Sequence, residues 1–199
     1  MRPLVLLAAL AITASCGSTA AAPTPTPTRL ATAPAIRTAA PTPPAGSACV
    51  VKPAAFTKAP SKATITLEKG GTITIALRPD KAPNTVTNFA NVALSGCYDG
   101  LTFHRVEPNF VIQGGDPAGN GTGGGTQPAE YNDLSFIKGA VGIARGQDKA
   151  INNKFQFYIC IGECKFLDGQ YTNFGLVTDG QSVADGVKIG DKIKTITVE

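Results

Sequence analysis

The residues best suited to chemistry lie together in one stretch, residues 103–116, which reads FHRVEPNFVIQGGD. Arg105 carries a permanently charged guanidinium with five N–H donors, and Gln113 offers both donors and an acceptor. Phe110 and Val111 add apolar surface beside them, and no nucleophile or group of metal ligands is evident. A fixed cation, an amide and an apolar wall favour chemistry by binding and electrostatics, without proton transfer or a covalent intermediate.

His104, the only histidine of the chain, also lies in this stretch. We expect it to be a packed or hydrogen-bonded strand residue rather than a general acid or base. A zinc site is not expected, because the cysteines do not form paired Cys-x-x-Cys motifs and the chain has a single histidine. We predict no metal and no cofactor.

The length and charge of the chain limit the classes of protein to which it can belong. Its 199 residues suffice for one domain with a sizeable core, plus a tail. The 18 Lys and Arg residues only slightly exceed the 14 Asp and Glu residues, and they are scattered, which argues against a nucleic-acid partner. The 22 glycines and the many Thr, Val and Ile residues indicate strands joined by tight turns.

The first 15 residues predict an export signal, with one positive charge at Arg2, an apolar run at 4–12 and then small residues. The run is too short to form a spanning helix. Residues 13–16, Thr-Ala-Ser-Cys, resemble the bacterial lipobox, in which the cysteine, here Cys16, is lipidated. The alternative is ordinary cleavage after the small residues 20–22, which would release a soluble secreted protein.

The segment after Cys16 is expected to be a tether. Residues 17–48 are almost wholly Ala, Pro, Thr and Ser, a composition that cannot bury enough apolar surface to offset its ordering entropy. We therefore divide the chain into a signal peptide at 1–15, a lipidated cysteine with a disordered tether at 16–60, and a folded domain at 61–199. The tether could serve to hold the domain at a distance from a membrane. It could equally be a low-complexity segment without a spacing role.

Alternation of apolar and β-branched residues predicts the strands of the folded domain. A hairpin is expected at 64–67 and 72–77, around Gly70 and Gly71. Further strands are predicted at 101–106, 110–113, 140–144, 155–161, 174–178 and 192–198.

Two helices complete the predicted fold. Helical spacing after Pro83 predicts a helix at 84–95, with Gly96 just past its end, and a shorter helix is predicted at 181–186. About eight strands and two helices favour a mainly β fold. We expect a closed antiparallel barrel, because closure removes exposed strand edges.

The glycine-rich loop at 119–125 superficially resembles a phosphate cradle. It lacks the Gly-Lys-Ser/Thr ending and the helix that should follow. We therefore interpret it as a flexible or closely approached loop at the rim of a site.

Several ordered motifs resemble those of the cyclophilins, which are peptidyl-prolyl cis-trans isomerases, over roughly residues 64–198. The motifs are YDGLTFHRV at 98–106, FVIQGGD at 110–116, GTGG at 121–124, QFYI at 156–159, FLDG at 166–169 and FG at 174–175. The family fold, an eight-stranded antiparallel barrel capped by two helices, agrees with the elements predicted above.

The resemblance implies catalytic roles for Arg105, Phe110 and Gln113. Arg105 falls on the family's catalytic arginine, Phe110 on the aromatic residue of the proline pocket, and Gln113 on the glutamine that binds a substrate carbonyl. The residues implied to bind substrate are Val111, Gly121, Ala144, Arg145, Gln156, Tyr158, Phe166, Leu167 and Tyr171.

Some of these positions depart from the family pattern. Tyr158 stands where the pocket floor is usually phenylalanine, so we expect weaker activity but not its loss. Phe166 replaces a common tryptophan, which implies weaker cyclosporin binding with isomerisation mostly retained. Tyr171 stands where many members have histidine, and residues 151–155 lack the small, serine-rich character usual there, which leaves the rim and the substrate preference open.

Four cysteines besides Cys16 form an even set, as expected for disulfides in an exported chain. Three pairings are possible. Cys160 and Cys164 bracket the end of a predicted strand and can close a small loop, which leaves Cys49 to join Cys97. Free buried thiols are the alternative.

The resemblance implies an enzyme that accelerates X-Pro bond rotation in exported proteins, with Arg105 donating to the prolyl nitrogen. Its partners would be proline-containing peptides and unfolded exported proteins, and it would touch the membrane only through a lipid on Cys16. We expect a monomer in the bacterial cell envelope, outside the cytoplasm. The alternative is a catalytically weak module of the same fold that binds proline-containing segments as a chaperone or scaffold.

Overall fold

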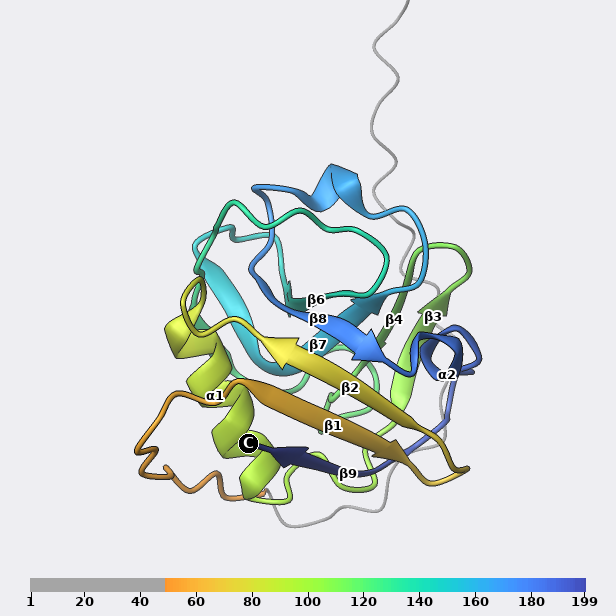
Figure 1. Cartoon of the computed structure of the whole chain (residues 1–199), viewed down its shortest axis with the longest axis horizontal. Coiled ribbons are helices and arrows are strands. Elements are labelled where there is room, and N and C mark those ends of the chain that lie inside the picture. Colours follow the sequence, from red (N-terminus) through yellow and green to blue (C-terminus); the bar gives the residue numbers. More distant parts are fainter. Residues whose placement is uncertain (1–48) are drawn as a thin grey trace, which may run out of the picture. The chain divides into compact units, whose positions relative to one another are not determined.

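The protein, seen here as a computed structural model, is described over residues 49–199 (Figure 1). The predicted signal peptide, Cys16 and residues 17–48 of the predicted tether lie outside the described residues. Within residues 49–199, no helix has the length and apolar character needed to cross a membrane.

The domain begins with the predicted hairpin, β1 (Lys62–Leu67) and β2 (Thr72–Leu77), paired antiparallel. Gly70 and Gly71 both have φ of +92°, a conformation that L side chains rarely adopt, so the tight turn depends on them. Every second residue of each strand is buried, including Ile65 in β1. The alternation in the sequence is therefore the alternation between core and solvent.

Helix α1 (Pro83–Leu94) follows, with proline in its first turn. Its own residues do not cap it. Instead Glu130, far along the chain, accepts hydrogen bonds from the backbone N–H groups of Asn84 (3.0 Å) and Thr85 (2.7 Å). This carboxylate satisfies two of the unpaired donors at the helix start and complements the helix dipole. The predicted helix, 84–95, is confirmed within one residue at each end.

The remaining elements are the other strands of one antiparallel sheet and two short helices. They are β3 (Phe103–Glu107), β4 (Val111–Gly114), β5 (Thr126–Pro128), β6 (Ala140–Arg145), β7 (Ile151–Cys160), a 3₁₀ helix (Lys165–Leu167), β8 (Asn173–Asp179), α2 (Gln181–Asp185) and β9 (Ile193–Val198). The strand order is β3-β4-β7-β6-β8-β2-β1-β9, and β5 pairs with β7. The mainly β fold with two helices is confirmed.

The sheet curls until its two edge strands approach each other. Just before β3 and β9, Thr102 and Lys192 form an isolated bridge, and the N–H of Phe103 donates to the carbonyl of Asp191 at 2.9 Å. The predicted barrel therefore closes over this short bridge rather than along the full length of the edge strands.

Two features of the sheet differ from the sequence prediction. Strand β5 was not predicted, and β7 begins at Ile151 rather than at residue 155. The added part of β7 pairs with β5, Gln127 lying opposite Asn152, and both of these polar residues are buried. Strand predictions based on apolar alternation miss such a ladder, because its buried positions are amides.

The core lies inside the curled sheet and centres on aromatic residues. The ring of Phe89 on α1 lies 5.2 Å from Phe174, 5.3 Å from Tyr98 and 5.6 Å from Phe157 between centroids. These rings come from a helix, a loop and two strands. They join the helix to the sheet through offset and edge-to-face contacts.

Residues 49–60, which belong to the predicted tether, lie against α1. Cys49 is joined to Cys97 by a disulfide. The N–H of Lys52 donates to the Ser95 hydroxyl, and that of Ala54 to the Asn91 side chain, both at 2.9 Å. We call residues 49–60 the strap.

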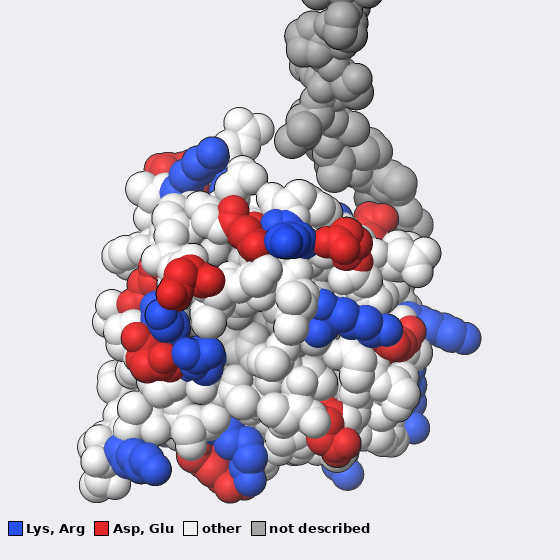
Figure 2. Space-filling model, turned by 45° about the horizontal axis from the view of Figure 1, so that its top comes forward, with Lys and Arg blue, Asp and Glu red and all other residues white. Residues whose placement is uncertain are grey.

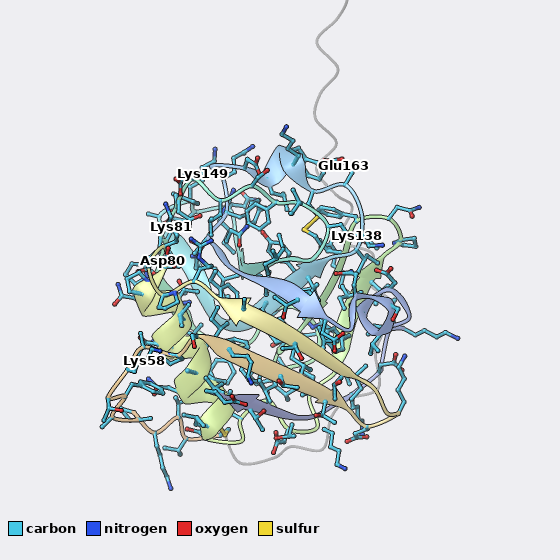
Figure 3. All side chains as sticks on the ribbon, viewed as in Figure 1. Lys58, Asp80, Lys81, Lys138, Lys149 and Glu163 are labelled. Atoms are coloured by element: carbon cyan, nitrogen blue, oxygen red, sulfur yellow. A yellow bond between two sulfur atoms is a disulfide. The ribbon has the colours of Figure 1, made fainter. Side chains whose placement is uncertain are left out.

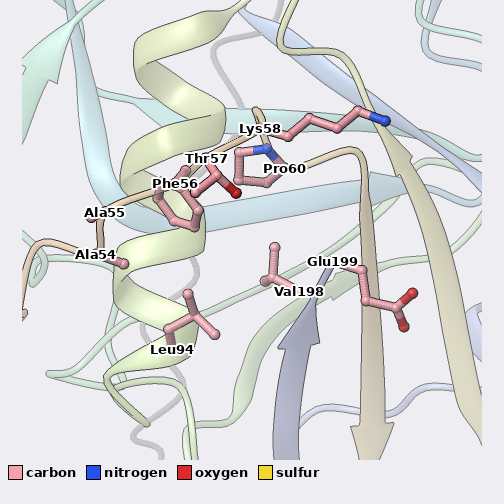
Figure 4. A pocket seen from close by; sticks show the side chains of 9 residues that line it. All are labelled: Ala54, Ala55, Phe56, Thr57, Lys58, Pro60, Leu94, Val198 and Glu199. Atoms are coloured by element: carbon pink, nitrogen blue, oxygen red, sulfur yellow. The ribbon is translucent and has the colours of Figure 1, made fainter.

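A shallow hollow of about 380 Å³ lies where the strap passes the end of α1 and the end of β9 (Figure 4). Leu94 and Val198 face it from the helix and the strand. None of the residues predicted to form a site lines it. The candidate site is elsewhere.

Charged side chains are intermixed over the face shown in Figure 2, with no area of a single sign. Many are paired, as in the contact between Lys81 and Asp133 at 2.6 Å. Figure 3 labels Lys81. It also labels Lys149 and Glu163, and these two mark two loops at one end of the molecule. The surface is consistent with the small net charge of +4.

Candidate active site

One row of residues crosses four neighbouring strands on the outer face of the sheet. Arg105 on β3 lies opposite Gln113 on β4, Gln113 lies opposite Tyr158 on β7, and Tyr158 lies opposite Gly142 on β6. Paired residues of antiparallel strands point to the same face, and their sequence neighbours point to the other. The stretch 103–116 therefore supplies only half of this row.

Amide groups connect the row to the glycine-rich loop. Arg105 Nη1 donates to Gln113 Oε1 at 3.2 Å, and Gln113 Nε2 donates to Gln156 Oε1 at 3.0 Å. Gln156 Nε2 then donates to the carbonyl of Gly123 at 2.8 Å. This chain fixes the orientation of both amides and holds one edge of the guanidinium.

The guanidinium keeps donors available. Its Nε lies 3.5 Å from the Glu107 carboxylate, a partly exposed pair of the kind that contributes little energy. Within residues 49–199, Nη2 has no hydrogen-bond partner. Arg105 Cζ lies 5.7 Å from the centroid of the Phe110 ring, so the free edge borders an apolar surface.

That apolar surface belongs to a cluster separate from the main core, which we call the outer cluster. Its buried members are Val111, Phe136, Ala140, Ala144, Tyr158, Cys160, Cys164 and Leu167, with Phe110 and Tyr171 partly buried beside them. Six of the predicted site residues fall in it. It forms the apolar wall that the sequence predicted beside the cation.

Tyr158 lies at the base of the outer cluster and is only 4% exposed. Its ring stacks on Phe136 at 5.8 Å and meets Tyr171 edge-on at 6.0 Å. The hydroxyl is buried without a hydrogen-bond partner among the described residues. Burial raises the pKa of Tyr158 well above its ordinary value, so the phenol stays neutral.

A short disulfide loop forms the wall next to Phe110. Cys160, opposite Val111 in the β4–β7 ladder, is joined to Cys164, which directly precedes the 3₁₀ helix. That helix buries Leu167 in the outer cluster and leaves Phe166 59% exposed, with its ring 5.1 Å from that of Phe110. Of the three possible cysteine pairings, the structure contains 49–97 and 160–164.

The glycine-rich loop meets the chain of amides through the Gly123 carbonyl. The buried carboxylate of Asp116 accepts hydrogen bonds from the N–H groups of Ala118 (3.0 Å), Asn120 (2.9 Å) and Gly121 (2.5 Å). The amides of this loop are therefore engaged with a carboxylate, which does not suit a phosphate site. Gly121 itself makes no direct contact with the row.

Arg145 occupies the opposite rim. Its guanidinium lies over the Tyr171 ring at 4.3 Å, and its Nε donates to the carbonyl of Gln170 at 3.0 Å. Ala144, next to it, is buried in the outer cluster. Stacking holds this second cation beside the outer cluster, against which Tyr171 packs.

His104 forms no hydrogen bond with the residues of this arrangement. Burial lowers the pKa of His104, and both of its ring nitrogens lie buried without a partner among residues 49–199. In the same range, no group of three or more His, Cys, Asp or Glu side chains is placed to hold a metal ion.

Two contributors were not predicted from the sequence. Asn153 Oδ1 accepts from the N–H groups of Phe155 and Gln156, both at 2.8 Å, and its Nδ2 donates to the Gly123 carbonyl. It thereby holds the irregular part of β7 that presents Gln156. Phe136 stacks on Tyr158 from a segment without regular structure, so no periodicity could identify it.

Comparisons with known proteins agree with one another. The family model described as cyclophilin type peptidyl-prolyl cis-trans isomerase/CLD matches residues 62–198. A peptidyl-prolyl cis-trans isomerase of Synechococcus elongatus is 39% identical over 142 residues, covering 69% of this chain and 96% of its own length. Peptidyl-prolyl cis-trans isomerase B of Bacillus subtilis is 43% identical over 138 residues, covering 67% and 94%. A Cryptosporidium parvum cyclophilin, solved in the presence of the dipeptide Ala-Pro, superposes with a TM-score of 0.63 and 27% identity, covering 69% and 98%.

Proposed function

Because this chain belongs to the cyclophilin-type peptidyl-prolyl cis-trans isomerase family, we propose that its outer-face site accelerates rotation about X-Pro bonds through Arg105. The observation that carries the proposal is a guanidinium held by Gln113 on one edge, with a free edge facing the apolar surface of Phe110. A proline ring and its nitrogen require these two environments side by side.

The barrier to rotation arises from amide resonance and amounts to about 18–20 kcal/mol. In the twisted transition state the resonance is lost, and the prolyl nitrogen regains a lone pair that can accept a hydrogen bond. Arg105 donates to that lone pair, an interaction that is available chiefly in the transition state. A rate gain on the order of 10⁵ needs only about 7 kcal/mol, within reach of positioning and one charged donor.

The other site residues hold the substrate. Phe110, Val111, Tyr158 and Leu167 enclose the proline ring. Gln113 and the backbone near Ala144 hold the peptide on either side of the rotating bond. The Ala-Pro dipeptide used with the Cryptosporidium relative supports short proline-containing peptides as the substrate class.

Arg105→Ala tests the mechanism. In a protease-coupled assay with a proline peptide, we expect kcat/KM to fall about 10²- to 10³-fold, as when one oxyanion-type donor is removed, with an unchanged melting temperature. The control is Arg78→Ala, whose guanidinium pairs with Asp80 instead, and it should retain full activity. Equal rates for wild type and Arg105→Ala would refute the mechanism. No activity in either would support the alternative, a proline-segment-binding chaperone or scaffold.

The proposed setting is the bacterial cell envelope, with exported proteins as substrates and Cys16 as the lipidated anchor. The sequence of the first 16 residues and the two disulfides within residues 49–199 support it, because disulfides persist in oxidising compartments. Metabolic labelling with a palmitate analogue should label the wild type and leave Cys16→Ser unlabelled. An unlabelled wild-type protein would remove the anchor from the proposal and leave the soluble, secreted alternative.

A further inference from the structure

The fourth member of the row, Gly142, has no assigned role. It lies on β6 opposite Tyr158, in the same register row as Arg105 and Gln113. Its backbone does not adopt a positive φ, so its conformation is open to any L residue. The reason for a glycine must therefore be the space beside its Cα.

Tyr158 fills that space. A Cβ placed on Gly142 would collide with the Tyr158 ring at Cζ, Cε2 and the hydroxyl oxygen. The phenol thus lies directly on β6, where a side chain of residue 142 would otherwise stand. The residues two positions away on the same face, Ala140 and Ala144, are also small and buried in the outer cluster. Together the three form a shallow bed along β6 for the tyrosine.

The ring has little freedom to move sideways from this bed. Phe136 stacks on one side of it and Tyr171 meets it edge-on, while the sheet lies beneath. A methyl group on residue 142 would have to displace the ring by roughly 1.5 Å to restore ordinary carbon separations of about 3.5–4.0 Å. The remaining direction is away from the sheet, toward the other members of the outer cluster, which include Phe110 and Leu167.

We propose that Gly142 is a positioning residue that sets the depth of the proline pocket, by allowing Tyr158 to lie back against β6. This inference rests on the proposed function, since it concerns the recess in which the proline ring would sit. The larger tyrosine is accommodated by removing the side chain opposite it rather than by narrowing the pocket. Tyr158 then reduces activity less than its added hydroxyl alone would suggest.

Gly142→Ala tests the inference with peptides that differ only in the ring at the proline position. The series comprises azetidine-2-carboxylic acid, proline and pipecolic acid, with four-, five- and six-membered rings. For proline we expect KM to rise about tenfold, the lower end of the effect of one methylene in an apolar pocket, with kcat changed much less. The loss should grow with ring size, so the azetidine peptide is affected least. A general loss of stability would instead lower the activity toward all three peptides equally.

A double-mutant cycle identifies the residue through which Gly142 acts. The leucine side chain in Tyr158→Leu lacks the Cε2, Cζ and hydroxyl atoms that collide with a methyl on residue 142, so adding Gly142→Ala to that variant should change peptide affinity by less than about twofold. Gly186→Ala is the matched control, because a methyl there meets only ordinary contacts near the end of α2. It should leave the preference for ring size unchanged.

The inference and the proposed function fail in different ways. Affinities for the ring series, measured by titration calorimetry, report pocket depth even if the wild type shows no turnover, in which case the isomerase proposal fails alone. If Gly142→Ala does not fold, Gly142→Ala/Tyr158→Leu, which lacks all three colliding atoms, should restore folding, and its failure to do so would overturn the role of Gly142. Equal losses for all three rings, or the same loss in the Tyr158→Leu background, would overturn the role of Gly142.

Discussion

The two faces of strands β3, β4, β7 and β6 differ in composition, one being closely packed and apolar and the other carrying a cation, amides and a phenol. On the inner face Ile112, Phe157 and Ile143 are fully buried, and Phe157 meets three other aromatic rings edge-on. On the outer face, one residue away in each strand, Arg105 has an unpaired edge and Tyr158 an unpaired hydroxyl among the described residues. Strand alternation lets one set of strands carry stability on one side and unsatisfied, ligand-ready groups on the other.

The largest effect should come from exchanging one aromatic residue on each face for alanine. Phe157→Ala on the inner face should cost about 3–5 kcal/mol of unfolding free energy, as for other buried phenylalanines. Phe110→Ala on the outer face should change stability by less than about 1 kcal/mol but raise KM for proline peptides about 10-fold or more, given the area it offers to a ring. Urea unfolding and the isomerase assay measure the two quantities.

The control for this pair is the activity per folded molecule. Phe157→Ala should isomerise normally once corrected for its folded fraction, because its ring does not reach the outer cluster. If Phe157→Ala abolished turnover in a fully folded sample, or if Phe110→Ala unfolded the domain, the division between the faces would be wrong.

A smaller effect is expected from pH. Burial lowers the pKa of His104 in the folded state, so below the unfolded value of about 6.5 the unfolded chain binds a proton more readily. Stability should therefore fall as pH decreases from about 7 to about 5, and His104→Gln should flatten that dependence in urea unfolding. Turnover of the folded enzyme should not change over this range, because the mechanism moves no proton. A titration of kcat near the ordinary histidine pKa that His104→Gln removes would assign His104 a catalytic role.

The sequence predicted the parts of the molecule whose periodicity is apolar. The hairpin at Gly70 and Gly71 and helix α1 are within two residues of their predicted bounds, because their buried positions are aliphatic or aromatic. Strand β5 and the start of β7 were missed, because buried amides such as Asn152 look like loop residues in a sequence.

The site divides in the same way. Family motifs indicated Arg105, Phe110 and Gln113, and the structure brings them beside Gln156 and Tyr158. The contribution of Gly142 depends on strand register, which the sequence did not reveal until β6 and β7 could be aligned residue by residue. That of Phe136 depends on the path of an irregular segment and leaves no pattern in the sequence.

The disulfide between Cys49 and Cys97 also determines how the domain would bear mechanical load. A pull on the chain from the N-terminal side reaches Cys49 first and passes through the covalent bridge to the turn after α1. The rest of the strap and strand β1 (Lys62–Leu67) lie outside this path, so tension does not peel β1 from its neighbours β2 and β9. Force enters instead at the end of a helix whose Phe89 is anchored in the aromatic core.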